Sequence, residues 1–133
     1  MASASARPGL LPRLVLAVAA GLFAAFGVAF AMAPHRLAAT VEIGLPTKTA
    51  TTDFVATYGG FEIGFAIFLF YCLMRGDRIR LGLLASAWAV TGFAASRALA
   101  MFVLGDGQAV MYGALVFETV CAAAAFWAAS RVE

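Results

Sequence analysis

The sequence predicts an all-α integral membrane protein whose four helices form one bundle, and three observations predict it. Hydrophobic residues make up 64% of the chain and charged residues 12%, whereas soluble domains average about 45–50% apolar and about 25% charged residues. The mean hydropathy is +0.96. The apolar residues also gather in four runs, each long enough for a membrane-spanning helix of about 20 residues. These runs cover residues 14–32, 54–74, 81–104 and 110–130 of a single domain, residues 1–133.

The first run, residues 14–32, contains no charge and follows Arg7 and Arg13. A cleaved signal peptide is the alternative, because a basic start, an apolar stretch and the small-x-small triplet Ala31-Met32-Ala33 occur in that order. The apolar stretch of a signal peptide usually has about 7–15 residues. The run is longer than that, which favours a helix that is retained in the membrane.

The connection after the first run, residues 33–53, is the longest in the chain and contains prolines, glycine and charges. Residues 35–43 are expected to form a short helix at the membrane surface. Thr52 or Asp53 is expected to cap the helix of the second run, residues 54–74, because threonine and aspartate are common N-cap residues.

The remaining turns set the topology. A basic turn at residues 75–80 follows the second run, and the turn at residues 105–108 contains glycines that can adopt positive φ. Four spans place both termini on one side. That side holds more cationic residues, namely Arg7, Arg13, Arg75, Arg78, Arg80 and Arg131 against Arg36 and Lys48. By the positive-inside rule, we expect both termini in the cytoplasm.

Three ionisable residues fall inside the spans: Glu62, Arg97 and Glu118. A charge at membrane depth costs roughly 2.5–3.5 kcal/mol on insertion scales, so it usually has a partner or a function. Counted from the outer ends of their helices at 1.5 Å per residue, Glu62 and Glu118 lie roughly 12 Å deep and Arg97 roughly 10 Å deep. The three residues are therefore expected to share one level near the outer leaflet.

Small residues surround this level. Gly60 and Gly64 flank Glu62 in a Gly-x-x-x-Gly pattern, which lets helix backbones approach each other. The other residues expected at helix contacts are Gly59, Gly92 and Ser96. Tyr58 lies one turn before Glu62, so its hydroxyl is expected near the carboxylates.

Two glutamates and one arginine leave a net negative charge, so one glutamate must be protonated or needs a further cation. Three roles for the layer stay open at this point: a structural ion pair, a pocket for the head group of a ligand from the outer leaflet, or a site that handles protons or ions.

Other site chemistry has little support in the sequence. His35 is the only histidine and cannot hold a metal or haem alone, so no metal or cofactor is predicted. Cys72 and Cys121 are expected to differ by about 10 Å in depth, too far for a disulfide. No basic stripe points to nucleic acid. The predicted partners are the lipid bilayer and a lipid or membrane protein, and the oligomeric state is open.

The chain resembles the bacterial domain-of-unknown-function-4345 family, from about Ala17 to Ala129. The resemblance rests on the run from Asp53 to Glu62, on residues 92–97 with Gly105-Asp106-Gly107 after them, and on Phe117-Glu118. Members typically have Glu-x-Arg-Ala-x-Tyr-Gly-Gly at the second span, where this chain has Asp53 for the acid and Val55 for the arginine. The resemblance implies a four-span protein of the bacterial inner membrane, distantly similar to DoxX-like proteins, and no assigned activity.

Three functional hypotheses follow. The first is a small binding or accessory subunit of the inner membrane with Glu62, Arg97 and Glu118 as its polar layer. The second is a proton- or ion-coupled transporter that uses Glu62 and Glu118. The third, an enzyme acting on a membrane-embedded substrate, has the least support, because two acids alone specify no reaction.

Overall fold

The computed structural model describes residues 9–105 and 107–132. In this part of the chain all regular elements are helices, and four helical stretches are long and apolar enough to cross a membrane: Leu10–Met32, Lys48–Met74, Gly76–Leu104 and Ala109–Ala129. This confirms the predicted all-α, four-helix membrane architecture. Arg7 and Asp106, which entered the topology and family predictions, lie outside the described residues.

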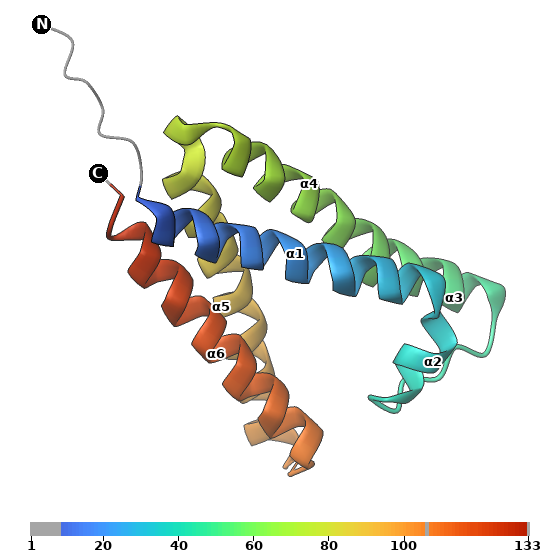
Figure 1. Ribbon diagram of the computed structural model, residues 1–133. Helices are drawn as coiled ribbons and strands as arrows, with labels where there is room; N and C mark the ends of the chain where they lie inside the picture. Colours follow the sequence, from blue (N-terminus) through green and yellow to red (C-terminus); the bar gives the residue numbers. More distant parts are fainter. Residues whose placement is uncertain (1–8, 106, 133) are drawn as a thin grey trace, which may run out of the picture.

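Figure 1 shows the order of the elements along the chain. They are α1 (Leu10–Met32), α2 (Pro34–Ala39), α3 (Lys48–Phe54), the π-helical segment η1 (Val55–Gly60), α4 (Phe61–Met74), the short 3-10 turn η2 (Gly76–Arg78), α5 (Ile79–Leu104) and α6 (Ala109–Ala129). Because α3, η1 and α4 follow one another directly, they make one continuous span. A π-helical segment inside a span was not predicted; such segments often occur at functional sites.

The second span begins earlier than predicted, because its N-cap is Thr47 and not Thr52 or Asp53. The hydroxyl oxygen of Thr47 accepts a hydrogen bond from the backbone N–H of Ala50 at 3.1 Å, as an N-cap side chain does. The hydroxyl of Thr52 instead donates to the carbonyl of Lys48 at 2.9 Å, one turn back, so Thr52 lies inside the helix.

The two connections at the end of the structure away from the termini turn through left-handed residues. The predicted helix at residues 35–43 ends at Ala39, because Glu42 has φ of 59° and Ile43 N–H donates to Ala38 C=O at 2.9 Å. This 6→1 bond is the helix ending known as a Schellman motif. Gly105 ends α5 with φ of 68°, as the glycines of that turn predicted.

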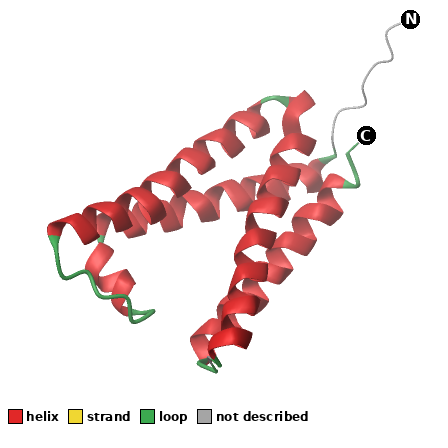
Figure 2. Cartoon of the chain, turned by 180° about the vertical axis from the view of Figure 1, so that it is seen from behind, coloured by secondary structure: helices red, strands yellow, loops and turns green. Residues whose placement is uncertain are grey.

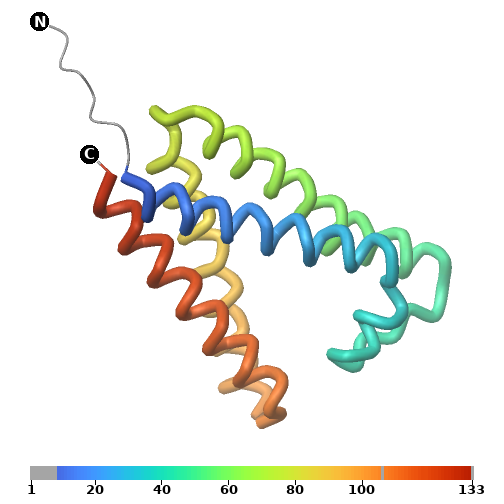
Figure 3. The backbone as a smooth tube through the Cα atoms, in the orientation of Figure 1, coloured from blue at the N-terminus to red at the C-terminus, as the bar shows by residue number. Residues whose placement is uncertain are grey.

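The four spans are arranged as two helix pairs that diverge. α1 packs along η1 and α4, and α5 packs along α6, while contacts between the pairs are fewer. Figures 1 and 2 show the pairs close together at the end where the chain termini lie and separated at the opposite end. The tube in Figure 3 shows the same opening between α1 and α6.

The buried core lies at the closed end, near the termini. It receives residues from all four spans: Leu16, Ala20, Leu69, Cys72, Ile79, Leu83, Ala128 and Ala129. The packing is close because Gly82 has no side chain: a Cβ there would lie 2.8 Å from the Cβ of Cys72. Both cysteines are free, in agreement with the absence of a disulfide expected from their depths.

Glycines also bring α1 against η1 and α4. A Cβ on Gly27 would lie 2.8 Å from the backbone nitrogen of Ile63, and a Cβ on Gly59 would lie 3.1 Å from the Cβ of Ala31. Real Cβ atoms do not approach a backbone as closely as the first of these distances, so α1 and α4 lie together only because Gly27 has no side chain.

We expect Gly27→Ala to destabilise the fold, because α1 and α4 must separate to admit the new methyl group. Overpacking of this kind costs about 1–3 kcal/mol. Gly21→Ala is the matched control on the same helix, since a Cβ at Gly21 meets nothing within 4 Å. The free energy of unfolding in mixed micelles is the measurement. Equal stabilities of the two variants would contradict the close approach of α1 and α4.

Candidate functional site

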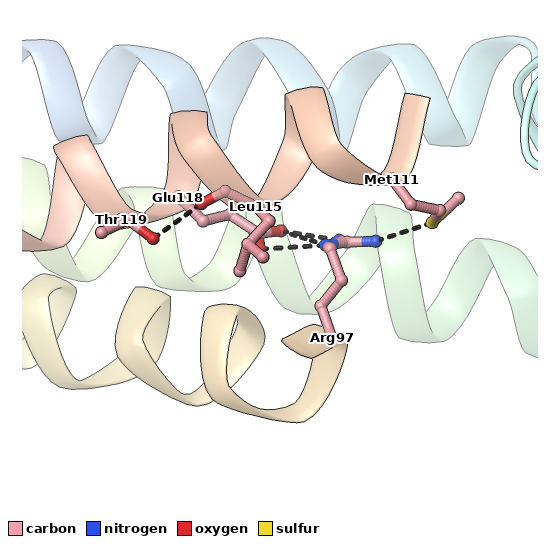
Figure 4. Close-up of polar contacts among 5 residues, drawn as sticks. All are labelled: Arg97, Met111, Leu115, Glu118 and Thr119. Carbon is pink, nitrogen blue, oxygen red and sulfur yellow. Dashed lines mark hydrogen bonds and ion pairs between the residues drawn. The ribbon is translucent and has the colours of Figure 1, made fainter. Parts of the chain in front are cut away.

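Arg97 of α5 and Glu118 of α6 form an ion pair inside the spans. The Arg97 Nη2 lies 2.6 Å from Glu118 Oε1, and Nε lies 3.2 Å from Oε1 and 3.0 Å from Oε2. Figure 4 shows the two side chains meeting between the helices. The antiparallel helices and their short turn place both residues at the same depth. Such two-point contact between guanidinium and carboxylate is the strong form of an ion pair.

A third side chain completes the surroundings of the guanidinium. Arg97 Nη1 donates to the sulfur of Met111 at 3.4 Å, on the same side of α6 as Glu118 (Figure 4). The neighbouring hydroxyl of Thr119 donates to the carbonyl of Leu115 at 2.7 Å, so it does not compete for the carboxylate. The side chains of Arg97 and Glu118 are 27% and 13% exposed. The ion pair is therefore mostly enclosed, and it links α5 to α6.

Glu62 lies apart from this ion pair. It is half-buried in the first turn of α4, and its Oε2 is buried with no hydrogen-bond partner among the described residues. Buried polar atoms are normally hydrogen-bonded, and each one without a partner costs about 1–3 kcal/mol. The structure thus brings together two of the three predicted charged residues and leaves the third with an unsatisfied oxygen.

Glu62 lines a cavity of about 470 Å³ between the second and third spans, together with Thr57, Tyr58, Phe61 and Phe93. Thr57 and Tyr58 come from η1, Phe61 and Glu62 from α4, and Phe93 from α5. The cavity is partly open to the surroundings of the protein. The lining is mostly apolar, with one carboxyl group and two hydroxyl groups, and ligand pockets usually have a lining of this kind.

Tyr58 and Glu62 both line this cavity, but among the described residues no hydrogen bond joins Tyr58 to either glutamate. The Tyr58 ring is held by aromatic neighbours, with centroids 4.7 Å from Phe54 and 5.7 Å from Phe30. These contacts fix the ring at the wall, and Tyr58 as a whole residue is 38% exposed.

The small residues predicted at helix contacts differ in burial: one lies in a close helix contact and four do not. Gly59 is buried against Ala31. Gly60, Gly64, Gly92 and Ser96 are exposed, and a Cβ on Gly64 or Gly92 would meet nothing within 4 Å. The close approach thus uses the face of Gly59 and Ile63, one residue away from the Gly60 and Gly64 face.

Sequence reasoning missed several residues of the site. Phe93 precedes Arg97 by one helical turn, and Met111 precedes Glu118 by two turns, so helical spacing alone could have placed both beside the charges. Phe61 and Thr57 could not have been found in this way. Thr57 lies in the π-helical segment and Phe61 directly follows it, and the sequence carried no recognised signal for that segment.

The end of the structure away from the termini has further polar contacts. Gln108, before α6, donates to Glu42 Oε2 at 3.4 Å and so bridges the loop after α2 to the turn between α5 and α6. His35 lies 3.4 Å from the hydroxyl of Thr51. Within residues 9–105 and 107–132, no group of three or more His, Cys, Asp and Glu residues could hold a metal ion.

Comparisons with known proteins place the chain in one family and add no activity. A family model described as Domain of unknown function (DUF4345) matches residues 11–129. No curated protein and no solved structure matches the chain.

We expect Arg97→Leu and Glu118→Leu each to lower the free energy of unfolding, because each leaves one charged or polar group buried without its partner. Removing one member of a buried pair costs roughly 3–5 kcal/mol in soluble proteins, so about 3 kcal/mol is expected for this partly enclosed pair. The double variant should lose less than the sum of the two, and Arg97→Lys less than Arg97→Leu. Reversible unfolding in mixed micelles gives the four values. Strict additivity in the double variant would contradict an energetic coupling between Arg97 and Glu118.

Proposed function

We propose that this chain, which belongs to the DUF4345 family, is a small binding subunit of its membrane that takes up the polar group of a ligand or partner beside Glu62. The single observation that carries this proposal is the carboxyl group of Glu62, which lines a cavity while its buried Oε2 lacks a hydrogen-bond partner among the described residues. A buried polar group that serves only the fold normally has a hydrogen-bond partner within the protein.

The distribution of charges supports this role. Arg97, the cation expected near Glu62, gives its Nε and Nη2 to Glu118. The guanidinium therefore neutralises Glu118, and Glu62 must be protonated or receive its partner from outside the protein. We propose that the three residues form one polar layer in which the Arg97 and Glu118 pair is structural and Glu62 is the group that binds.

The ion pair has a supporting role in this scheme. Phe93 lies one turn from Arg97 on α5 and forms the far wall of the cavity. Because Arg97 ties α5 to α6, the position of Phe93 depends on the ion pair. Loss of the pair would thus impair binding through geometry, without any contact between Arg97 and the ligand.

The arrangement of basic residues supports an orientation. Arg75 and Arg78 lie over the ring of Tyr71, with 5.8 and 5.3 Å to the centroid, and Arg131 lies 5.0 Å from the centroid of Trp127. All are at the end where the termini lie. By the positive-inside rule we place this end in the cytoplasm, which puts the Glu62 cavity in the outer half of the bilayer. The family resemblance points to the bacterial inner membrane.

A transporter that uses both glutamates as a proton site has weaker support. Glu118 is bound to Arg97 at 2.6 Å and does not line the cavity, so its carboxylate is already engaged in the contact between α5 and α6. Only Glu62 then remains for such a cycle.

We expect native mass spectrometry of the protein, gently extracted from its own membrane, to show a bound lipid or partner that is lost in Glu62→Gln. Glutamine keeps the shape of the side chain and removes its charge. Asp53→Asn is the matched control, because Asp53 is an exposed acid on the same span and does not line the cavity.

If the parent protein carries no bound molecule, or if Glu62→Gln carries the same molecule in the same amount, Glu62 is not a binding group. Arg97→Leu should also lose the ligand, together with stability, whereas Glu62→Gln should lose the ligand and remain folded.

A further inference from the structure

The chemistry of the Glu62 cavity points to the class of its ligand. Of the five lining residues, Glu62 is the one whose side chain can be charged near neutral pH, and its charged form is negative. Among the residues that the structure describes, no lysine, arginine or histidine lines this cavity. An anionic group such as a phosphate or carboxylate would therefore meet repulsion and find no cation, since Arg97 is engaged with Glu118.

Aromatic rings form most of the remaining wall. Tyr58, Phe61 and Phe93 line the cavity beside the carboxyl group. Aromatic faces attract ammonium groups through their quadrupole, by about 0.5–1 kcal/mol at exposed sites and about 2 kcal/mol when water is excluded. Aromatic rings that line a site are the groups with which proteins recognise alkylated ammonium ligands, and here three such rings line the same cavity as the carboxyl group.

Packing holds two of these rings in place before any ligand arrives. Tyr58 lies 4.7 Å from Phe54 between ring centroids, and Phe61 stacks on Phe65 at 6.1 Å with an angle of 4° between the rings. Rings that are already ordered lose little side-chain entropy on binding, so the wall is preorganised.

The size and place of the cavity indicate how much of a ligand enters. A volume of about 470 Å³ holds a head group and a short part of a chain, within the usual range of about 300–1,000 Å³ for ligand sites. The cavity is partly open, and its lining residues belong to two membrane-spanning helices. An attached acyl or alkyl chain can therefore continue into the surrounding lipid.

Neutral polar ligands fit less well. A sugar or polyol needs several directed hydrogen bonds, and the lining offers two hydroxyl groups, from Thr57 and Tyr58, beside the Glu62 carboxyl group. An ammonium group instead needs one counter-charge and apolar or aromatic walls, and both are present.

Building on the proposed function, we infer that the Glu62 cavity binds the ammonium head of an amphiphile, with the cation beside the Glu62 carboxylate and the rings of Tyr58, Phe61 and Phe93. Two sources share this chemistry. One is a membrane lipid with an amine head group, and the other is a water-soluble alkylammonium compound that enters the bilayer.

The test is equilibrium binding of radiolabelled decyltrimethylammonium to the full-length protein in maltoside micelles, with protein-free micelles subtracted. The parent should bind the cation at least tenfold more tightly than it binds decanol, which has the same chain without the charge. Glu62→Gln should weaken cation binding at least tenfold, and Asp53→Asn should change it less than twofold. Phe93→Leu keeps the wall apolar and removes a ring, so it should weaken cation binding about threefold to tenfold without changing decanol binding.

Competition separates the two sources. Phosphatidylethanolamine added to the micelles should displace the probe if a lipid amine is the natural ligand, while diacylglycerol, which lacks the head group, should not. Binding of the probe that resists both lipids would identify a water-soluble amine as the source, and either result supports an ammonium site.

Equal binding of decyltrimethylammonium and decanol to the parent protein would overturn the inference, and this comparison needs no variant to fold. If the mass spectrum shows a native ligand that depends on Glu62 but the cation binds without Glu62, the binding function stands and the ammonium class is wrong. If neither the native ligand nor the cation depends on Glu62, both the function and the inference fail.

Discussion

The cost of an unpaired charge away from water is the constraint on which the rest of this structure depends. Arg97 lies within a membrane-spanning helix. Its contacts to both oxygens of Glu118 and to the sulfur of Met111 offset the cost of its charge there. These contacts tie α5 to α6 with polar bonds, which hold helices together where lipid provides no hydrophobic drive. Among the described residues Glu62 makes no such contact, and we therefore propose Glu62, not the paired residues, as the group that binds.

Two kinds of helix contact explain why the bundle opens at one end. α1 approaches η1 and α4 at Gly27 and Gly59, while α5 and α6 are linked by the ion pair. The two pairs share a packed core only near the termini, around residues such as Leu16 and Leu83. In the part of the chain that the structure describes, no such core joins them at the level of Glu62, where the cavity with aromatic walls lies.

The fold could be predicted from the sequence to a large extent, and the site to a smaller one. Long apolar runs dictate membrane helices because the backbone must satisfy its own hydrogen bonds in lipid, and the glycine of the last turn, Gly105, indicated its left-handed backbone. The cap at Thr47 was missed because several threonines in a row offer equivalent hydroxyl groups. The face of closest approach was missed by one residue, at Gly59, because Gly59 and Gly60 look alike in sequence but point in different directions around the helix.

The sequence by itself determined that four helices cross a membrane and that Glu62, Arg97 and Glu118 lie within them, because hydropathy and helical rise are properties of single segments. Only the tertiary structure decided which glutamate Arg97 pairs with, because two acids at similar depth are distinguished solely by which helices are neighbours. It also decided that Phe93 lines the same cavity as Glu62, since the orientation of a side chain around one helix relative to another is set by packing. The physical reason is the same throughout: depth is local, whereas pairing depends on contacts between helices.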